Sequence, residues 1–160
     1  DPQGRRTVAD FFSDLEYRVF NVGRLDIQSE GLLLITNDGD LAHRLTHPRY
    51  QVKKTYLVVC RGKLTQQERR TLEQGVPLED GVTAPALVRS VRPTGNGNTS
   101  LLITISEGKN RQVRRMLEAL GHETLRLRRL SVGPISLGDL APGEWRFLTW
   151  PELDKLLKQS

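Results

Sequence analysis

The chain has a single cysteine, Cys60, among its 160 residues. One thiol excludes an intrachain disulfide and any zinc site that needs several cysteines. Cys60 closes the apolar run 56–60, YLVVC. Because free cysteines in apolar surroundings pack as small hydrophobic side chains, this pattern predicts a buried and unreactive thiol.

Long hydrophobic runs are lacking too. No apolar stretch approaches the roughly 20 residues that cross a bilayer, and the printed sequence does not open on a basic and then apolar leader. We therefore expect a soluble, cytoplasmic protein that does not enter membranes. Its 160 residues show no dividing linker and no internal repeat, which predicts one domain over residues 1–160.

Motifs for metal binding and for phosphate loops are also missing. The stretch that begins at Asp26 starts like a calcium loop, but Asn37 stands where such a loop needs a bidentate glutamate. His43 and His47 are spaced i, i+4 without the neighbouring glutamate of a metalloprotease helix. The Gly-Asn segment 95–98 lacks the lysine and the following helix of a phosphate loop. None of these three motifs therefore predicts a metal site or a phosphate loop.

Positive charge is present and unevenly spread. The net charge is +5 and the isoelectric point is about 9.7. Within residues 107–130, seven basic and three acidic side chains leave +4, which is most of the total. Concentrated arginine is the expected footprint of a phosphate-backbone partner, and it also occurs on the solvated face of a helix. Charge alone leaves both interpretations open.

One arginine in this segment has an unusual predicted position. The segment 109–123 predicts a helix that is ended by Gly121. Its apolar stripe consists of Val113, Met116, Leu117 and Leu120. Arg115 would point away from that stripe and Arg111 nearly so, whereas Arg114 would lie at its border, partly desolvated and in need of a carboxylate. Glu118, four residues later, or a carboxylate from a distant loop could be that partner.

Asp26 raises a similar choice. It lies between the turn Gly23-Arg24 and the apolar run GLLLIT, residues 31–36. A short aspartate in such a place caps a turn in many proteins. An acid held on a rigid support would serve a reaction instead. The local pattern by itself favours the turn.

The remaining pattern predicts an α+β fold, with a mixed, largely antiparallel sheet flanked by helices. Turn residues and alternating apolar residues delimit the elements. Strands are predicted in 17–22, 31–36, 53–62, 125–137 and the tail from 142, and two more joined by a Gly/Asn loop within 84–108. Helices are predicted in 1–15, in 41–47 behind Asp38 or Asp40, in 64–75 between Thr65 and Gly75, in 109–123 and at the end of the tail.

Four segments in order resemble one known family. They are VGRLDIQSEGLLLITNDGDLAHRLTHP, KKTYLV, EGKNRQVRRMLEALGH and LRRLSVGPISLGDLAPGEWRFLT. They resemble the signatures of ribosomal RNA pseudouridine synthases of the RsuA/RluB type, and the resemblance runs from about Asp1 to Thr149. Members of that family usually begin with an S4-type RNA-binding domain, so this chain resembles their catalytic domain alone.

The resemblance implies an isomerase that needs no cofactor or metal. It would break the N1–C1′ bond of a flipped-out uridine and rejoin the base through C5. The family's essential aspartate falls on Asp26, its active-site tyrosine on Tyr56 and its basic residue on Arg114. Its pocket-lining aliphatic residue falls on Leu125, with Leu127 as the alternative. Whether Asp26 attacks C1′ or removes the C2′ proton stays open.

The implied partner is a stem-loop of ribosomal RNA, with the large subunit favoured by EGKNRQVRRM, and the implied state is a monomer. The competing hypothesis is a non-enzymatic RNA-binding module, which would use the basic surface but not Asp26. The residues expected to hold the RNA backbone are Arg24, Arg44, Lys54, Lys109, Asn110, Arg111, Arg115, Arg128 and Arg129.

Overall fold

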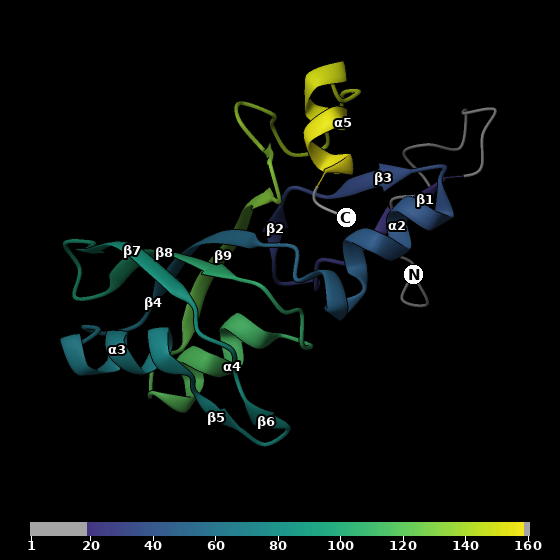
Figure 1. Cartoon of the computed structure of the whole chain (residues 1–160). Helices are drawn as coiled ribbons and strands as arrows, with labels where there is room; N and C mark the ends of the chain where they lie inside the picture. The colour runs from purple at the N-terminus through teal and green to yellow at the C-terminus, as the bar shows by residue number, and fades with distance from the viewer. Residues whose placement is uncertain (1–18, 159–160) are drawn as a thin grey trace.

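A computed structural model describes residues 19–158 of the chain. Its main sheet has the order β10-β9-β4-β8-β7, and β2 pairs with β9 outside that path. Only the β2–β9 pairing in this sheet is parallel, so the predicted mixed, largely antiparallel α+β fold is confirmed (Figure 1). The strands are β2 (Glu30–Gly31), β4 (Lys54–Cys60), β7 (Leu87–Pro93), β8 (Thr99–Ile105), β9 (Thr124–Val132) and β10 (Ile135–Ser136).

Smaller elements gather at the two ends of this sheet. The hairpin of β5 (Pro77–Leu78) and β6 (Gly81–Val82) lies with α3 and α4 at one end (Figure 1). The pair β1 (Phe20–Val22) and β3 (Leu34–Thr36) lies with α2 and α5 at the other end. The helices are α2 (Gly39–Thr46), η1 (Pro48–Tyr50), α3 (Gln66–Gln74), α4 (Gln112–Ala119) and α5 (Trp150–Leu157).

The interior of the described chain has two apolar clusters, which we call the first and the second core. Strand β9 belongs to both, because Leu127 lies in the first core and Val132 in the second. Cys60 is fully buried in the first core, as predicted. Other members of the first core are Val58, Leu72, Leu101, Ile103, Met116 and Leu117, and of the second core Leu32, Leu34, Leu41, Leu45, Ile135 and Leu156.

Local capping signals placed the starts of α2 and α3 correctly. Asp38 caps α2, and its side chain accepts hydrogen bonds from the backbone N–H groups of Asp40 and Leu41. Thr65 and Glu68 form the capping box of α3, which ends at Gly75. Such caps satisfy backbone N–H groups that have no partner within the helix, so a short helix gains stability from its first residue.

The predicted strand 31–36 is wrong as a single element. Leu32 donates its N–H to the Arg129 carbonyl, so the chain first pairs with β9 and then crosses to pair with β1. Gly31 makes this crossing possible at a φ of +121°, because a Cβ there would lie 2.2 Å from the Arg129 carbonyl oxygen. An apolar run shows that a segment is buried, but not that it changes partners halfway.

Three further differences concern a strand that is absent, a hairpin that was not predicted and the start of a helix. The strand predicted in the tail is absent from the described residues 142–149, where the segment is exposed and turns at Glu144, which donates its N–H to the Ala141 carbonyl. The hairpin β5–β6 was not predicted, and helix α4 begins at Gln112 rather than at residue 109. The helix predicted in 1–15 lies outside the described residues.

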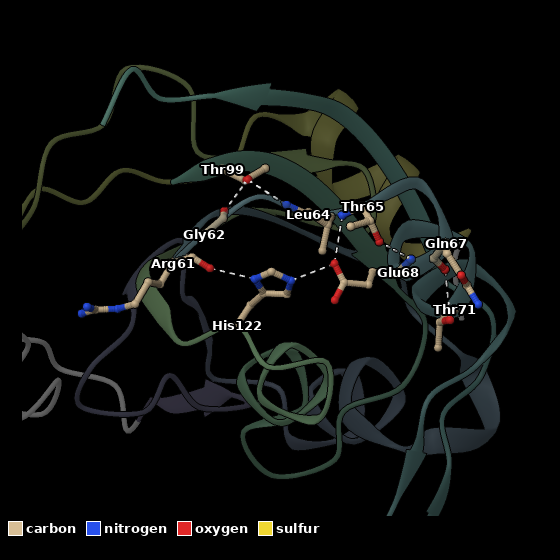
Figure 2. Close-up of polar contacts among 9 residues, drawn as sticks. All are labelled: Arg61, Gly62, Leu64, Thr65, Gln67, Glu68, Thr71, Thr99 and His122. Carbon is tan, nitrogen blue, oxygen red and sulfur yellow. Dashed lines mark hydrogen bonds and ion pairs between the residues drawn. The ribbon is translucent and has the colours of Figure 1, made fainter. Parts of the chain in front are cut away.

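A polar network ties the end of α4 to the start of α3 (Figure 2). His122 Nδ1 lies 2.7 Å from the Arg61 carbonyl oxygen and Nε2 lies 2.9 Å from Glu68 Oε1. Both partners are acceptors, so both contacts are hydrogen bonds only when both ring nitrogens carry a proton. Burial lowers the pKa of His122, but the bonds to Glu68 and Arg61 outweigh it and raise the pKa above 6.5.

Candidate active site

Asp26 lies in the loop between β1 and β2, with 25% of its side chain exposed. Its Oδ1 accepts hydrogen bonds of 2.9 Å from the Gln28 N–H and from the Ser29 hydroxyl. The Ser29 N–H also donates to the Asp26 carbonyl. The turn interpretation is therefore correct as far as it goes, because the carboxylate closes its own turn.

The second carboxylate oxygen of Asp26 faces helix α4. Arg114 Nε lies 3.6 Å from Asp26 Oδ2, and its Nη2 donates a 2.7 Å hydrogen bond to the Gln28 carbonyl. At 3.6 Å the contact is an ion pair and not a hydrogen bond, so Arg114 Nε has no hydrogen-bond acceptor among residues 19–158. The partner of Arg114 is thus a loop carboxylate from far away in the sequence, while Glu118 is exposed.

The apolar face of α4 sets this geometry. Val113, Met116 and Leu117 are at most 3% exposed, and Arg114 at their border is 6% exposed, as the stripe predicted. Arg115 points the other way and makes a two-point contact with Asp80, at 2.9 and 3.2 Å. Arg114 therefore faces Asp26, whereas Arg115, the next residue of the helix, faces a different surface that carries Asp80.

Tyr56 lies on β4 and shares a sheet face with Val58 and Cys60, since alternate residues of a strand point the same way. It is half-buried, packs against the first core and pairs across the sheet with Arg129. Leu127, opposite Val58, is on the same face and 5% exposed. No hydrogen bond joins Tyr56 to the Asp26–Arg114 pair within the described residues.

The two candidate pocket leucines differ in their surroundings. Leu125 is 42% exposed and lies where the β4–β9 register shifts, between the partners of Val59 and Cys60. Leu127 is buried in the core against which Tyr56 packs. The sequence resemblance favoured Leu125, whereas the geometry favours Leu127 as the residue that borders Tyr56.

The residues predicted to contact RNA are not one patch. Arg111 and Arg128 lie around the Asp26 loop, where Arg111 donates to the Gln28 side chain and Arg128 pairs with Glu30. Arg115 lies by the β5–β6 turn. The others are Arg24 and Arg44, both exposed, Asn110, whose carbonyl accepts from Arg115, Lys109 beside Gly81, and Lys54 and Arg129 next to Tyr56.

Glu30 is a site residue that sequence reasoning missed. It accepts a 2.8 Å hydrogen bond from Arg126 and a 3.3 Å one from Arg128, both on β9. The hydrogen bond from Arg126 is the main cause that lowers the pKa of Glu30. These bonds tie β2 to β9 and so fix the loop that carries Asp26. Gln28 and Ser29, two and three residues after Asp26, were also missed, although that spacing is typical of an aspartate turn.

An apolar groove lies next to this site and not at it. It is lined by β3, α2, α5 and the segment 135–148, and Leu25 and Glu30 reach its rim. Asp26, Tyr56 and Arg114 are not among its lining residues. No three or more His, Cys, Asp or Glu residues between 19 and 158 gather as metal ligands would. No helix in that range is long and apolar enough to cross a membrane.

The fold and the site together define a class: an α+β protein with a loop carboxylate held by a helical arginine, in basic surroundings. Comparison with known proteins gives the family. A family model described as RNA pseudouridylate synthase matches residues 3–119, and the chain belongs to this family. The site residues themselves remain predictions.

Relatives in other organisms agree with this placement. The chain is 48% identical to an uncharacterized RNA pseudouridine synthase of Aquifex aeolicus, over 98% of this chain and 63% of that protein. It is 43% identical to ribosomal large subunit pseudouridine synthase B of Bacillus subtilis, over 98% of this chain and 64% of that protein. The chain thus spans somewhat less than two thirds of the length of these relatives.

Solved structures support the same fold. A crystal structure of a pseudouridylate synthase superimposes with a TM-score of 0.79 at 34% identity, over 91% of this chain and 64% of that one. The archaeal box H/ACA sRNP Nop10–Cbf5 complex shares the fold with a TM-score of 0.55 at 16% identity, over 81% of this chain and 42% of that one.

Proposed function

We propose that this chain carries the catalytic centre of an enzyme that converts a uridine of large-subunit ribosomal RNA to pseudouridine. The observation that carries the proposal is the Asp26–Arg114 pair, in which a partly buried carboxylate is oriented by two donors on Oδ1 and one guanidinium at Oδ2. The family supports the reaction type. The names of the relatives that act on the large ribosomal subunit support the substrate.

The reaction begins when the uridine leaves its stack, which costs a few kcal/mol, and enters the space beside Asp26. The carboxylate attacks C1′ or removes the C2′ proton, and the N1–C1′ bond breaks. The detached base turns and C5 bonds to C1′, while the Asp26–C1′ bond breaks in the first route or Asp26 returns the proton to C2′ in the second, and N1 ends with a proton. The C5 proton must then leave, and Tyr56 on β4, opposite Arg129 of β9, is the candidate base or relay for it.

The supporting residues have physical roles in this scheme. Arg114 lies beside Asp26 and offsets part of the cost of placing a carboxylate in a partly buried position. Leu127 forms an apolar wall beside Tyr56, which keeps water from the reactive sugar. The basic side chains around the loop hold the RNA backbone while the base is extruded.

The decisive test is to map pseudouridine in ribosomal RNA from cells with and without the gene, and to complement with Asp26→Asn. We expect one uridine to lose its modification in the absence of the protein and Asp26→Asn not to restore it. In vitro, that variant should not release tritium from RNA labelled at uridine C5, while its thermal midpoint stays near the wild-type value. Release at the wild-type rate would remove Asp26 from the mechanism, and an unchanged map would favour an RNA-binding module.

A further inference from the structure

Two basic side chains next to Tyr56 have no acidic partner among residues 19–158. Lys54, the first residue of β4, is half-buried, and no hydrogen bond or ion pair joins its ammonium group to another described residue. Arg129 on β9 is 4% exposed. Its Nε donates to the Leu32 carbonyl at 2.8 Å, whereas its Nη2 is buried without a hydrogen-bond partner in the described chain.

These two cations are neighbours on one face of the sheet. Lys54 and Tyr56 are alternate residues of β4, and Tyr56 pairs with Arg129. Burial, and then the charge of Arg129, lower the pKa of Lys54, and no carboxylate acts against them. Holding two like charges together in a partly buried place costs free energy that an anion between them would offset.

Four other arginines on α4 and β9 have an acidic partner, whereas Arg111, at the start of α4, is exposed and donates to the Gln28 side chain. Arg114 pairs with Asp26, Arg115 pairs with Asp80, and Glu30 serves both Arg126 and Arg128. An anion that arrives from outside therefore gains most from the charges that have no such partner. Lys54 and Arg129 are in that position and also border Tyr56.

The ammonium group of Lys54 lies near the protein surface. Its Nζ lies beside Gly108, where a Cβ would stand 3.4 Å from the ammonium group. Gly108 is exposed, so the ammonium group lies at the edge of solvent, while Arg129 lies deeper in the protein. Lys54 is thus the group that meets the anion, and Arg129 contributes its charge from behind.

We propose that Lys54, backed by Arg129, binds one phosphate diester of the substrate RNA next to the uridine that is extruded. The proposal rests on the proposed function for the identity of the substrate. Extruding a nucleotide bares the phosphates on either side of it, and fixing one of them sets the register of the sugar against Asp26. The subsite thus fixes the position of one nucleotide, which a general electrostatic attraction for RNA does not do.

The test is a double-mutant cycle between Lys54 and single phosphates. The probe is the ribosomal RNA stem-loop that the protein protects from ribonuclease, with methylphosphonate placed at one loop phosphate at a time. Lys54→Met keeps the apolar stem and removes the charge. We expect the variant to weaken binding about tenfold, as the loss of one phosphate contact does. One neutralised phosphate beside a uridine should weaken wild-type binding to the same extent and should not weaken Lys54→Met any further.

Independent losses at every loop phosphate would overturn the subsite. Lys63→Met is the matched control, because Lys63 is exposed in the loop between β4 and α3, and it should leave the cycle unchanged. Lys54→Arg restores a charge and should restore the coupling, which distinguishes a lost contact from a damaged fold. Affinity is measured instead of turnover. Coupling without pseudouridine would therefore contradict only the proposed function, and pseudouridine without coupling would contradict only the subsite.

Discussion

At the scale of single residues, the site depends on Asp26, because its two carboxylate oxygens have different partners. Asp26 closes its own turn through Oδ1 and meets Arg114 through Oδ2. Local bonds thus set the rotamer of the carboxylate, and a helix from far away in the sequence sets its electrostatic environment. Removing Arg114 should therefore lower the rate of the reaction and leave the turn at Asp26 in place.

Neighbouring arginines on α4 provide a matched pair to test this. Arg114→Ala leaves a partly buried carboxylate without its cation, and we expect the rate of pseudouridine formation to fall about ten- to a hundredfold, the equivalent of a hydrogen bond to a charged group. Arg115→Ala breaks an exposed pair with Asp80, which is worth at most about 1 kcal/mol, and should leave the rate nearly unchanged. Single-turnover kinetics on ribosomal RNA measure both. Equal losses would show that the border position of Arg114 has no special role.

At the scale of elements, what the sequence predicts depends on how local the cause is. The caps at Asp38 and Thr65 act within three residues, and the stripe of α4 repeats within one helix, so both were predictable. The division of 31–36 depends on Arg129, which a single apolar run does not reveal. The same is true of the pairing of Arg114 with Asp26. The turn of the hairpin β5–β6 is Glu79-Asp80, which is not one of the usual two-residue turn pairs, so this hairpin has a weak local signal.

The link between α3 and the end of α4 should make stability depend on pH. The pKa of His122 is raised above 6.5 in the folded protein, so its contribution is complete below 6.5 and is lost as the pH rises through the folded-state value. We expect His122→Gln to lower the free energy of unfolding by about 1–3 kcal/mol at pH 6, as for hydrogen bonds to charged groups, and by less at pH 8.5. Urea denaturation of both proteins across this range measures the difference.

His43 provides the control for that titration. It is exposed on α2, so His43→Gln removes a histidine without touching the link between α3 and α4. Glu68 governs the acid side: burial raises its pKa, but hydrogen bonds from Thr65 and His122 lower it below 4.5 overall. Its contribution therefore persists until the pH falls through that lowered value. A His122→Gln curve parallel to the wild type from pH 6 to 8.5 would mean that the ring carries no titrating proton.

At the scale of the whole molecule, the site lies where the two cores meet. Strand β9 runs from Leu127 in the first core to Val132 in the second, and Arg129 lies between them opposite Tyr56. Asp26 approaches from the side of the second core, since its loop leads into Leu32 and Leu34. Arg114 approaches on α4 from the side of the first core. The pair that carries the proposed reaction therefore forms only when both halves are folded together.

That arrangement predicts one cooperative unfolding transition, which would support the single domain expected from the sequence. Leu117→Ala in the first core and Leu45→Ala in the second should each lower the free energy of unfolding by about 2–5 kcal/mol, with the midpoint of the whole protein moving in both cases. Leu87→Ala, at a 52% exposed position, should change it by less than about 0.5 kcal/mol. Far-ultraviolet circular dichroism follows both halves, whereas tryptophan fluorescence follows only the end near α5, because Trp145 and Trp150 are the two tryptophans. If Leu45→Ala moved the fluorescence transition and left a separate dichroism transition in place, the two cores would be independent units, and pseudouridine formation would be lost while half of the protein stayed folded.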